Sequence, residues 1–444
     1  MRKFIFALLL LPYSIFGQGW EKNLYSGGGV GSSGANFIGA HDVLQSSDGS
    51  FFILSSAEYG IYTGIMLIHI DQSGNVINTR LFHSGSGSFY PQDFNLTTTN
   101  DLIITGYYGS FSNYEYFLAT FNTQSWSFTD FEEWGGGGTN DDLANAVIES
   151  SDNHFIVTGS TNAAGNGWTT GAETYDMFIT KYTPNFTEIW TRYIGGNEDQ
   201  LSKDLKETTD GGFILVGSTR QINGNILFPR EVYLVKTSSS GTVQWSNSYN
   251  VGPQQSAIGK SVIQTTDGGY LILGENPNAS TGDVFLLKTN SSGNFLWFKT
   301  FEGLYAYEVE QTNDGGFILI ANNFSTNNEK TILIKTDSNG NQIWKNSFSE
   351  GSICYSVACG SVRQTSDGGF IFVRPMDNSA NEGVYVVKTD ANGNSTTTFE
   401  INFTNKNLID IVDVLGKDVN KKKYNTPLIY LYDDGTVEKK LIIE

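Results

Sequence analysis

The residue types that most often carry out catalysis are few and dispersed in this sequence. Its four histidines, His41, His69, His83 and His154, lie far apart and form no H-E-x-x-H motif. That motif places two zinc-binding histidines on one face of a helix, and the G-x-S-x-G turn of α/β-hydrolases is missing as well. No local motif therefore predicts a nucleophile, a catalytic metal or a cofactor. A pair of carboxylates brought together from distant segments stays possible.

Two glycine-containing segments resemble ligand loops only in part. Asp337–Asn341 (D-S-N-G-N) places oxygen side chains at alternate positions, as calcium loops do, but its glycine comes too early and a distal acidic ligand is missing. The same pattern recurs at Asp71 and Asp390, which favours a structural turn. Gly259–Ser261 (G-K-S) ends like a phosphate-binding loop, but the glycine upstream of it is at the wrong distance and a strand pattern follows. Neither segment predicts a site.

The two cysteines, Cys354 and Cys359, stand close together in one connecting segment. In an exported protein a local disulfide is plausible if the chain turns between them, and the alternative is two buried thiols. The spacing is not C-x-x-C and no histidine is near, so we expect neither a redox nor a metal site.

A repeated phrase fills most of the chain and must build the scaffold for any site. Its clearest copies begin at Glu207, Gln264, Gln311 and Gln364 and share the core D-G-G-[FY], followed by an apolar run. Three weaker copies lie around Asp48, Thr99 and Asp152. Successive copies are 51, 53, 58, 57, 47 and 53 residues apart when positions 48, 99, 152, 210, 267, 314 and 367 are compared. A period near fifty residues with several strands per unit is typical of a β-propeller.

One repeat contains four strand-like runs. In the fourth repeat they span residues 203–208, 213–218, 231–236 and 242–249. The middle runs are continuously apolar, which predicts strands buried on both faces between stacked sheets. Asp-Gly-Gly joins runs one and two, and Ser-Gly or Asn-Gly-Asn joins runs three and four, as tight hairpins require.

The ends of the repeat region indicate how the ring closes. The fourth run carries a tryptophan in most repeats, but the seventh repeat ends at Phe399 without one. The missing phrase occurs near the N-terminus, where W-E-K-N-L-Y starts at Trp20. We therefore predict an all-β fold, a seven-bladed β-propeller over residues 18–399, in which residues 20–25 pair beside the third strand of the last blade.

Both ends of the chain predict export. Residues 1–17 have two basic residues, then an apolar run and small residues, as secretory signal peptides do. Residues 400–444 break the repeat period and contain D-V-L-G-K from Asp413, I-Y-L-Y-D-D-G-T-V from Ile429 and K-K-L-I-I from Lys439. This tail resembles the C-terminal sorting domain of type IX secretion cargo. The resemblance implies outer-membrane passage by the type IX machinery, with release or surface attachment, and a sorting role for the following residues: Asp413, Leu415, Gly416, Asp434, Gly435, Lys439 and Lys440.

Loop length predicts which face of the propeller binds a ligand. The turns between strands one and two and between three and four are nearly constant, whereas the connections from strand two to three and from blade to blade vary. Propeller topology places both variable sets on one face, around the mouth of the central channel. Trp168, Tyr175, Phe228 and Arg230 lie in two long connections of this kind and are candidate contacts for a glycan or a protein. Each is alternatively an aromatic or basic side chain packed on a neighbouring blade.

The net charge of −19 argues against nucleic acid and anionic membranes as partners. The apolar run near the N-terminus is too short to span a membrane, and no other stretch approaches the necessary length. Two functions stay open. The first is a secreted or surface binding and adhesion module without a cofactor, which the resemblance to D-G-G-[FY] propeller repeats of bacterial surface proteins favours. The second is an exported polysaccharide hydrolase or lyase, which two or three carboxylates with an arginine at the channel mouth would favour.

Overall fold

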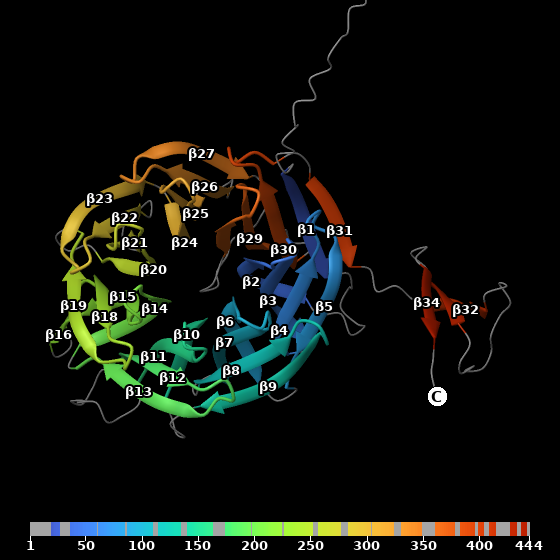
Figure 1. Cartoon of the computed structure of the whole chain (residues 1–444), viewed down its shortest axis with the longest axis horizontal. Coiled ribbons are helices and arrows are strands. Elements are labelled where there is room, and N and C mark those ends of the chain that lie inside the picture. Colours follow the sequence, from blue (N-terminus) through green and yellow to red (C-terminus); the bar gives the residue numbers. More distant parts are fainter. Residues whose placement is uncertain are drawn as a thin grey trace, which may run out of the picture.

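A computed structural model of the chain shows seven sheets arranged as blades around a central axis (Figure 1). It describes residues 19–403, except 27–35, 60, 85–86, 110–113, 135–139, 163–173, 197, 224–225, 252–255, 277–282, 303, 324–329, 349–359, 378–381 and 396–397, and also residues 408–413, 427–432 and 437–441. All regular secondary structure in these residues is β-strand. The predicted all-β, seven-bladed propeller is confirmed.

Each blade runs outward from the axis as an antiparallel meander. The strands of blades one to three are, in order, β2 (Asn36–Gln45), β3 (Phe51–Tyr59), β4 (Tyr62–Ile70) and β5 (Val76–Phe82); β6 (Ser88–Leu96), β7 (Leu102–Gly109), β8 (Tyr114–Asn122) and β9 (Ser127–Trp134); and β10 (Asp142–Glu149), β11 (Phe155–Thr161), β12 (Asp176–Tyr182) and β13 (Glu188–Ile194).

Blades four to six follow the same order. Their strands are β14 (Asp199–Glu207), β15 (Phe213–Arg220), β18 (Glu231–Thr237) and β19 (Val243–Tyr249); β20 (Ile258–Gln264), β21 (Tyr270–Asn276), β22 (Asp283–Thr289) and β23 (Phe295–Glu302); and β24 (Leu304–Gln311), β25 (Phe317–Asn323), β26 (Lys330–Thr336) and β27 (Gln342–Phe348). A short hairpin, β16 (Ile222–Asn223) and β17 (Ile226–Leu227), lies within the long β15–β18 connection.

The Asp-Gly-Gly turn has a polar construction that explains its recurrence. In blade four the N–H of Gly211 donates to the carbonyl of Thr208 at 2.8 Å, and Gly211 has a φ of 75°, a left-handed conformation that favours glycine. The Asp210 carboxylate accepts from the Thr208 hydroxyl at 2.5 Å and from the Gly212 N–H at 3.1 Å. The aspartate therefore closes the turn.

A lysine from the third strand reaches the same aspartate in five blades. Lys236 Nζ lies 3.0 Å from Asp210 Oδ2 and also donates to the Thr237 carbonyl at 2.8 Å. The equivalent ion pairs are Lys181–Asp152, Lys288–Asp267, Lys335–Asp314 and Lys388–Asp367. These lysine side chains are almost fully buried while the aspartates are more exposed, so each pair lets a strand lysine enter the packed region between blades without an unpaired charge.

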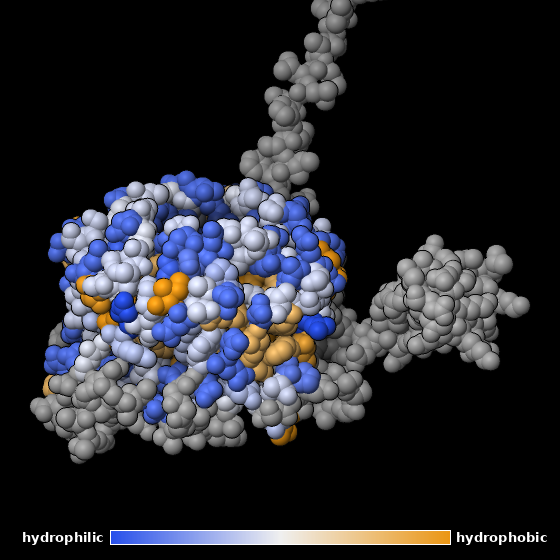
Figure 2. Space-filling model, turned by 60° about the horizontal axis from the view of Figure 1, so that its bottom comes forward, coloured by the Kyte–Doolittle hydropathy of each residue, from blue (hydrophilic) through white to orange (hydrophobic). Residues whose placement is uncertain are grey.

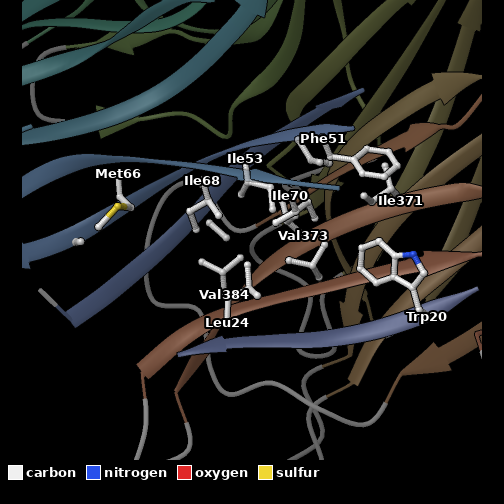
Figure 3. Close-up of a cluster of buried hydrophobic side chains, with 14 residues drawn as sticks. Trp20, Leu24, Phe51, Ile53, Met66, Ile68, Ile70, Ile371, Val373 and Val384 are labelled. Atoms are coloured by element: carbon white, nitrogen blue, oxygen red, sulfur yellow. The ribbon is translucent and has the colours of Figure 1, made fainter. Parts of the chain in front are cut away.

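The N-terminal strand closes the ring as predicted. The last blade consists of β28 (Ser361–Gln364), β29 (Phe370–Asp377) and β30 (Glu382–Thr389), and β1 (Trp20–Ser26) pairs antiparallel with β30 from Trp20 opposite Lys388 to Tyr25 opposite Gly383. Trp20 and Leu24 point into a buried cluster shared by blades seven and one (Figure 3). The side chain of Gln45 also accepts the backbone N–H of Ser366 at 2.8 Å, across the same junction.

One strand was not predicted. β31 (Thr398–Phe403) pairs in parallel with β1 and makes the last blade five-stranded, so it runs across the expected boundary at residue 399. Beyond it, β32 (Leu408–Asp413), β33 (Pro427–Tyr432) and β34 (Val437–Leu441) form a separate antiparallel sheet within the predicted sorting tail. Residues 1–17, Cys354 and Cys359, together with Leu415, Gly416, Asp434 and Gly435, lie outside the described residues.

Candidate functional site

A cavity of about 450 Å³ lies on blade four, on the face that carries the variable connections. Phe228 and Pro229 supply apolar lining from the β15–β18 connection, and the Phe228 ring is 44% exposed. The polar lining consists of hydroxyl, amide, guanidinium and carboxylate groups, from Glu198, Thr219, Arg220, Gln221, Glu231, Ser248 and Asn250. An exposed ring beside many hydrogen-bonding groups suits a polar ligand that also has an apolar face.

The carboxylates of this cavity are held in place by their neighbours. Thr219 donates to Glu198 at 2.9 Å, and Asn250 donates to Glu231 at 3.1 Å. Both acceptors keep further lone pairs, because a carboxylate has about four acceptor sites. The cavity wall can therefore accept hydrogen bonds from ligand hydroxyls without rearranging.

Of the other candidate contacts, Arg230 is committed to the scaffold. Its guanidinium lies 2.6 Å from Asp199, which Arg220 also approaches at 2.7 Å. Burial lowers the pKa of Arg230, and Asp199 opposes that shift. Asp199 is 1% exposed, so the two arginines neutralise a buried carboxylate.

Tyr175 joins two connections instead of facing a cavity of its own. Its hydroxyl donates to Asp141 at 3.1 Å and its backbone N–H donates to Asp199 at 3.1 Å. Trp168 lies outside the described residues. The structure thus places Phe228 in the cavity wall and brings neither Arg230 nor Tyr175 into the lining of the same cavity.

A cluster of three tyrosines on blade two was missed by the sequence reasoning. Tyr90 of β6 stacks on Tyr107 of β7 with ring centroids 5.1 Å apart, and Tyr114 of β8 packs edge-on to both. Burial, together with Tyr114 and Tyr90, raises the pKa of Tyr107 to about 12. The three rings come from different strands and meet only through sheet pairing, so no local spacing could have predicted them.

The central channel holds a second cavity, of about 120 Å³, which is lined from all seven blades. In six blades the innermost strand has a β-bulge at the cavity, and the bulged residue lines it. These residues are His41, Gln92, Asn145, Lys203, Lys260 and Tyr307. A bulge re-aims a side chain relative to its strand, and six such bulges around one axis direct six side chains to the same place.

Directly after the bulge, four blades carry an acidic residue that bonds the backbone. Asp93 accepts the N–H of Val147 at 2.8 Å, and Asp204 accepts the N–H of Val262 at 2.9 Å, in each case from the next blade. Glu308 accepts the backbone N–H of Val362 at 3.1 Å, and Asp42 accepts that of Val43 at 2.7 Å. These carboxylates therefore satisfy donors around the bulges.

Three of these four acids also have a basic partner. Arg363 bridges Asp42, at 3.0 Å, and Glu308, and Lys206 lies 2.8 Å from Asp204. Burial raises the pKa of Asp42 to about 6, with Glu308 adding to the shift and Arg363 opposing it. Burial, and secondarily Asp42, raises the pKa of Asp93 well above its usual range.

Carboxylates with an arginine thus do meet in the channel, which is the feature expected to favour an enzyme. Asp42 and Glu308 are, however, both paired with Arg363, and each also accepts a backbone N–H, Asp42 from its own strand and Glu308 from the adjacent blade. His41 is held neutral, because burial lowers its pKa to about 3. His69 packs on Phe52 and Trp126 and lies 2.8 Å from the Ser50 hydroxyl, as a structural residue would.

The surface and the remaining described residues add two observations. Figure 2 shows one side of the ring on which hydrophilic residues dominate and apolar residues gather only in small areas. Within the described part of the chain, no group of three or more His, Cys, Asp or Glu side chains has metal-binding geometry, and no helix is long and apolar enough to cross a membrane.

Comparison with known proteins identifies the fold and no family. No family profile and no curated protein matches the chain. Among solved structures, an ulvan lyase of polysaccharide lyase family PL25 superposes with a TM-score of 0.51 at 10% identity, over 85% of this chain and 96% of the lyase. The polysaccharide lyase Uly1 (TM-score 0.48, 9% identity, 84% and 99% covered) and the Dos1 propeller (0.49, 11%, 86% and 86%) are also similar. At these identities the likeness shows the propeller fold alone.

Proposed function

We propose that this protein is an exported carbohydrate-binding propeller without catalytic activity, which uses the cavity beside Phe228. The observation that carries the proposal is the composition of that cavity. One exposed aromatic ring lies beside hydroxyl, amide and carboxylate groups that are already oriented. Sugars offer both an apolar face and a rim of hydroxyls, and this wall complements both.

The position of the cavity supports the same proposal. The β15–β18 connection that carries Phe228 is an insertion on a repeated hairpin, so it can vary without disturbing the strands. The polar turns of the opposite face are built from closed hydrogen-bond sets, as at Asp210. A ligand on the variable face would therefore leave the scaffold unchanged.

The experiment is a glycan-array screen of the full chain, followed by titration of the strongest hit with two variants. Phe228→Ala removes the exposed ring from the cavity. Phe295→Ala is the matched control, since Phe295 is 56% exposed on the outer strand β23 of the next blade. We expect Phe228→Ala to weaken binding about tenfold or more, a difference of roughly 1.4 kcal/mol, and Phe295→Ala to leave it unchanged. Equal affinities of the two variants would contradict this site.

A second candidate function is favoured by the acids and arginine of the channel. Asp42, Glu308 and Arg363 form the kind of cluster that a polysaccharide hydrolase or lyase uses, and one of the similar folds is a polysaccharide lyase. We rank it second because both carboxylates already pair with Arg363 and accept backbone N–H groups. A panel of acidic and neutral polysaccharides decides between the two. Turnover that is lost in Glu308→Gln would replace the binding proposal with the enzymatic one.

The export part of the proposal rests on the two chain ends. Deleting residues 407–444 in the native host should leave folded propeller in the periplasm, because the sorting motifs are removed and the ring is left intact. Fractionation followed by immunoblotting measures this. Normal appearance of the truncated protein outside the cell would refute the type IX assignment, whatever the result of the glycan screen.

A further inference from the structure

We propose that the central channel is a second ligand site, which binds a small hydroxylated carboxylate such as a sugar acid between Lys203 and Lys260. This site is separate from the cavity beside Phe228 and does not depend on it. It is formed by the six bulged residues that line the channel cavity.

The first argument is the charge around Lys203. Of the three lysines in the cavity, Lys206 is paired with Asp204, and Lys260 lies 2.8 Å from Glu275. Lys203 has no ion pair within the part of the chain that the structure describes. Burial lowers its pKa to about 8, the positive charges of Lys260 and Arg230 add to the shift, and the carboxylate of Glu275 opposes it. An anion at this point would give the half-buried Lys203 the direct ion pair that the described residues do not supply.

The second argument concerns His41, on another wall of the cavity. The side chain is 8% exposed, and its Nε2 lies 3.0 Å from the Ser56 hydroxyl. Its Nδ1 has no hydrogen-bond partner among the described residues. A buried polar atom without a partner costs free energy, and such atoms in native proteins commonly mark a missing ligand or water. When Nε2 accepts from Ser56, Nδ1 carries the proton and can donate it to a ligand oxygen.

The remaining walls indicate a ligand with hydroxyl groups and not a bare anion. The amide N–H groups of Gln92 and Asn145 donate to carbonyls of their own strands, at 3.0 and 3.3 Å. Their amide oxygens can therefore accept from ligand hydroxyls. A carboxylate on the lysine side and hydroxyls on the amide side would complement the cavity.

The bulges explain why this cavity can be a site without weakening the ring. A bulged residue is not paired in the ladder, so its side chain can change without loss of strand pairing. The seventh blade contributes Gly360 instead of a side chain, and an added Cβ there would lie 2.6 Å from the Val373 carbonyl. Side chains thus reach the cavity from six blades, and the seventh lines it with Gly360.

The test is isothermal titration of the full chain with D-glucuronate, with glucose and with inorganic sulfate. We expect one glucuronate per chain, weaker binding of sulfate and no binding of glucose. Lys203→Gln should weaken glucuronate binding about tenfold or more. Lys345→Gln is the control, because it changes the net charge equally on the exposed side of β27. Phe228→Ala should bind glucuronate normally, which separates this site from the glycan cavity.

Several results would overturn the proposal. They are the absence of saturable glucuronate binding, equal weakening by Lys203→Gln and Lys345→Gln, and sulfate binding as tight as glucuronate, which would mean a simple anion site. Lys203→Arg is the control for misfolding, because it keeps the positive charge and should retain most of the glucuronate binding. If Lys203→Gln has the thermal unfolding profile of the parent and still binds with unchanged affinity, the site is excluded.

Discussion

Replacing Leu24 by alanine is a direct test of how the ring closes. Leu24 lies in β1, is fully buried, and packs in the cluster between blades seven and one together with Val384, Val386 and Ile68 (Figure 3). If β1 is an integral outer strand of the last blade, the cost of this change is that of a core truncation. If β1 is only a peripheral arm, the cost is small.

The expected magnitude follows from the size of the deletion. Burial contributes about 0.8 kcal/mol per methylene, so the shortened side chain loses about 2.4 kcal/mol of transfer free energy. The unfilled volume adds to this, and the free energy of unfolding should fall by about 3 kcal/mol. With an m value of about 3 kcal/mol/M, the urea midpoint moves down by about 1 M.

The assay is urea unfolding followed by tryptophan fluorescence, with Leu296→Ala as the matched control. Leu296 is 51% exposed on β23, so the same chemical change there should cost less than about 0.5 kcal/mol. A midpoint for Leu24→Ala that equals the control would refute the conclusion that the N-terminal strand closes the ring.

Two other predictions concern the repeated turns. Gly340→Ala should destabilise the ring by about 1 kcal/mol or more, because Gly340 has a φ of 75° and an added Cβ would lie 2.7 Å from the Trp297 ring. Thermal unfolding measures this loss of stability, with Gly196→Ala as the control, because no atom lies within 4 Å of a Cβ added there. Asp210→Asn should cost stability at pH 6 but very little at pH 2. Burial raises the pKa of Asp210, but hydrogen bonds from Thr208 and Lys236 outweigh burial and lower this pKa to about 2. The ionised carboxylate therefore contributes to the free energy of unfolding above the unfolded pKa of about 3.8, and that contribution is lost as the pH falls toward 2. An unfolding difference between variant and parent that grows as the pH falls would contradict this reasoning.

Local features were predictable from the sequence because local residues determine them. The strand runs of blade four, the Asp-Gly-Gly turns and the number of blades depend on side-chain pattern and glycine conformation within a few residues. The pairing of residues 20–25 with the last blade was also predictable, although it joins segments far apart in the chain. The seventh repeat lacks its fourth strand, and the N-terminus carries an extra copy of the phrase that forms this strand, so few other arrangements are possible.

The sites could not be predicted in the same way, because they depend on which strands meet. A one-residue bulge in the innermost strand decides that Lys203 lines the channel, and the polar run from Ser202 to Asp204 gives no sign of where that bulge falls. Arg363 meets Asp42 only because the ring closes, across 321 residues.

The variable face shows the same division between sequence and tertiary structure. Residue type alone made Phe228 and Arg230 equal candidates. The structure separates them, since Phe228 is exposed in a cavity wall while Arg230 neutralises the buried Asp199. Whether a side chain is available to a ligand depends on the charges and donors that surround it after folding. The sequence by itself therefore determined the propeller scaffold, whereas only the tertiary structure decided which polar side chains the scaffold uses for itself and which it leaves for a ligand.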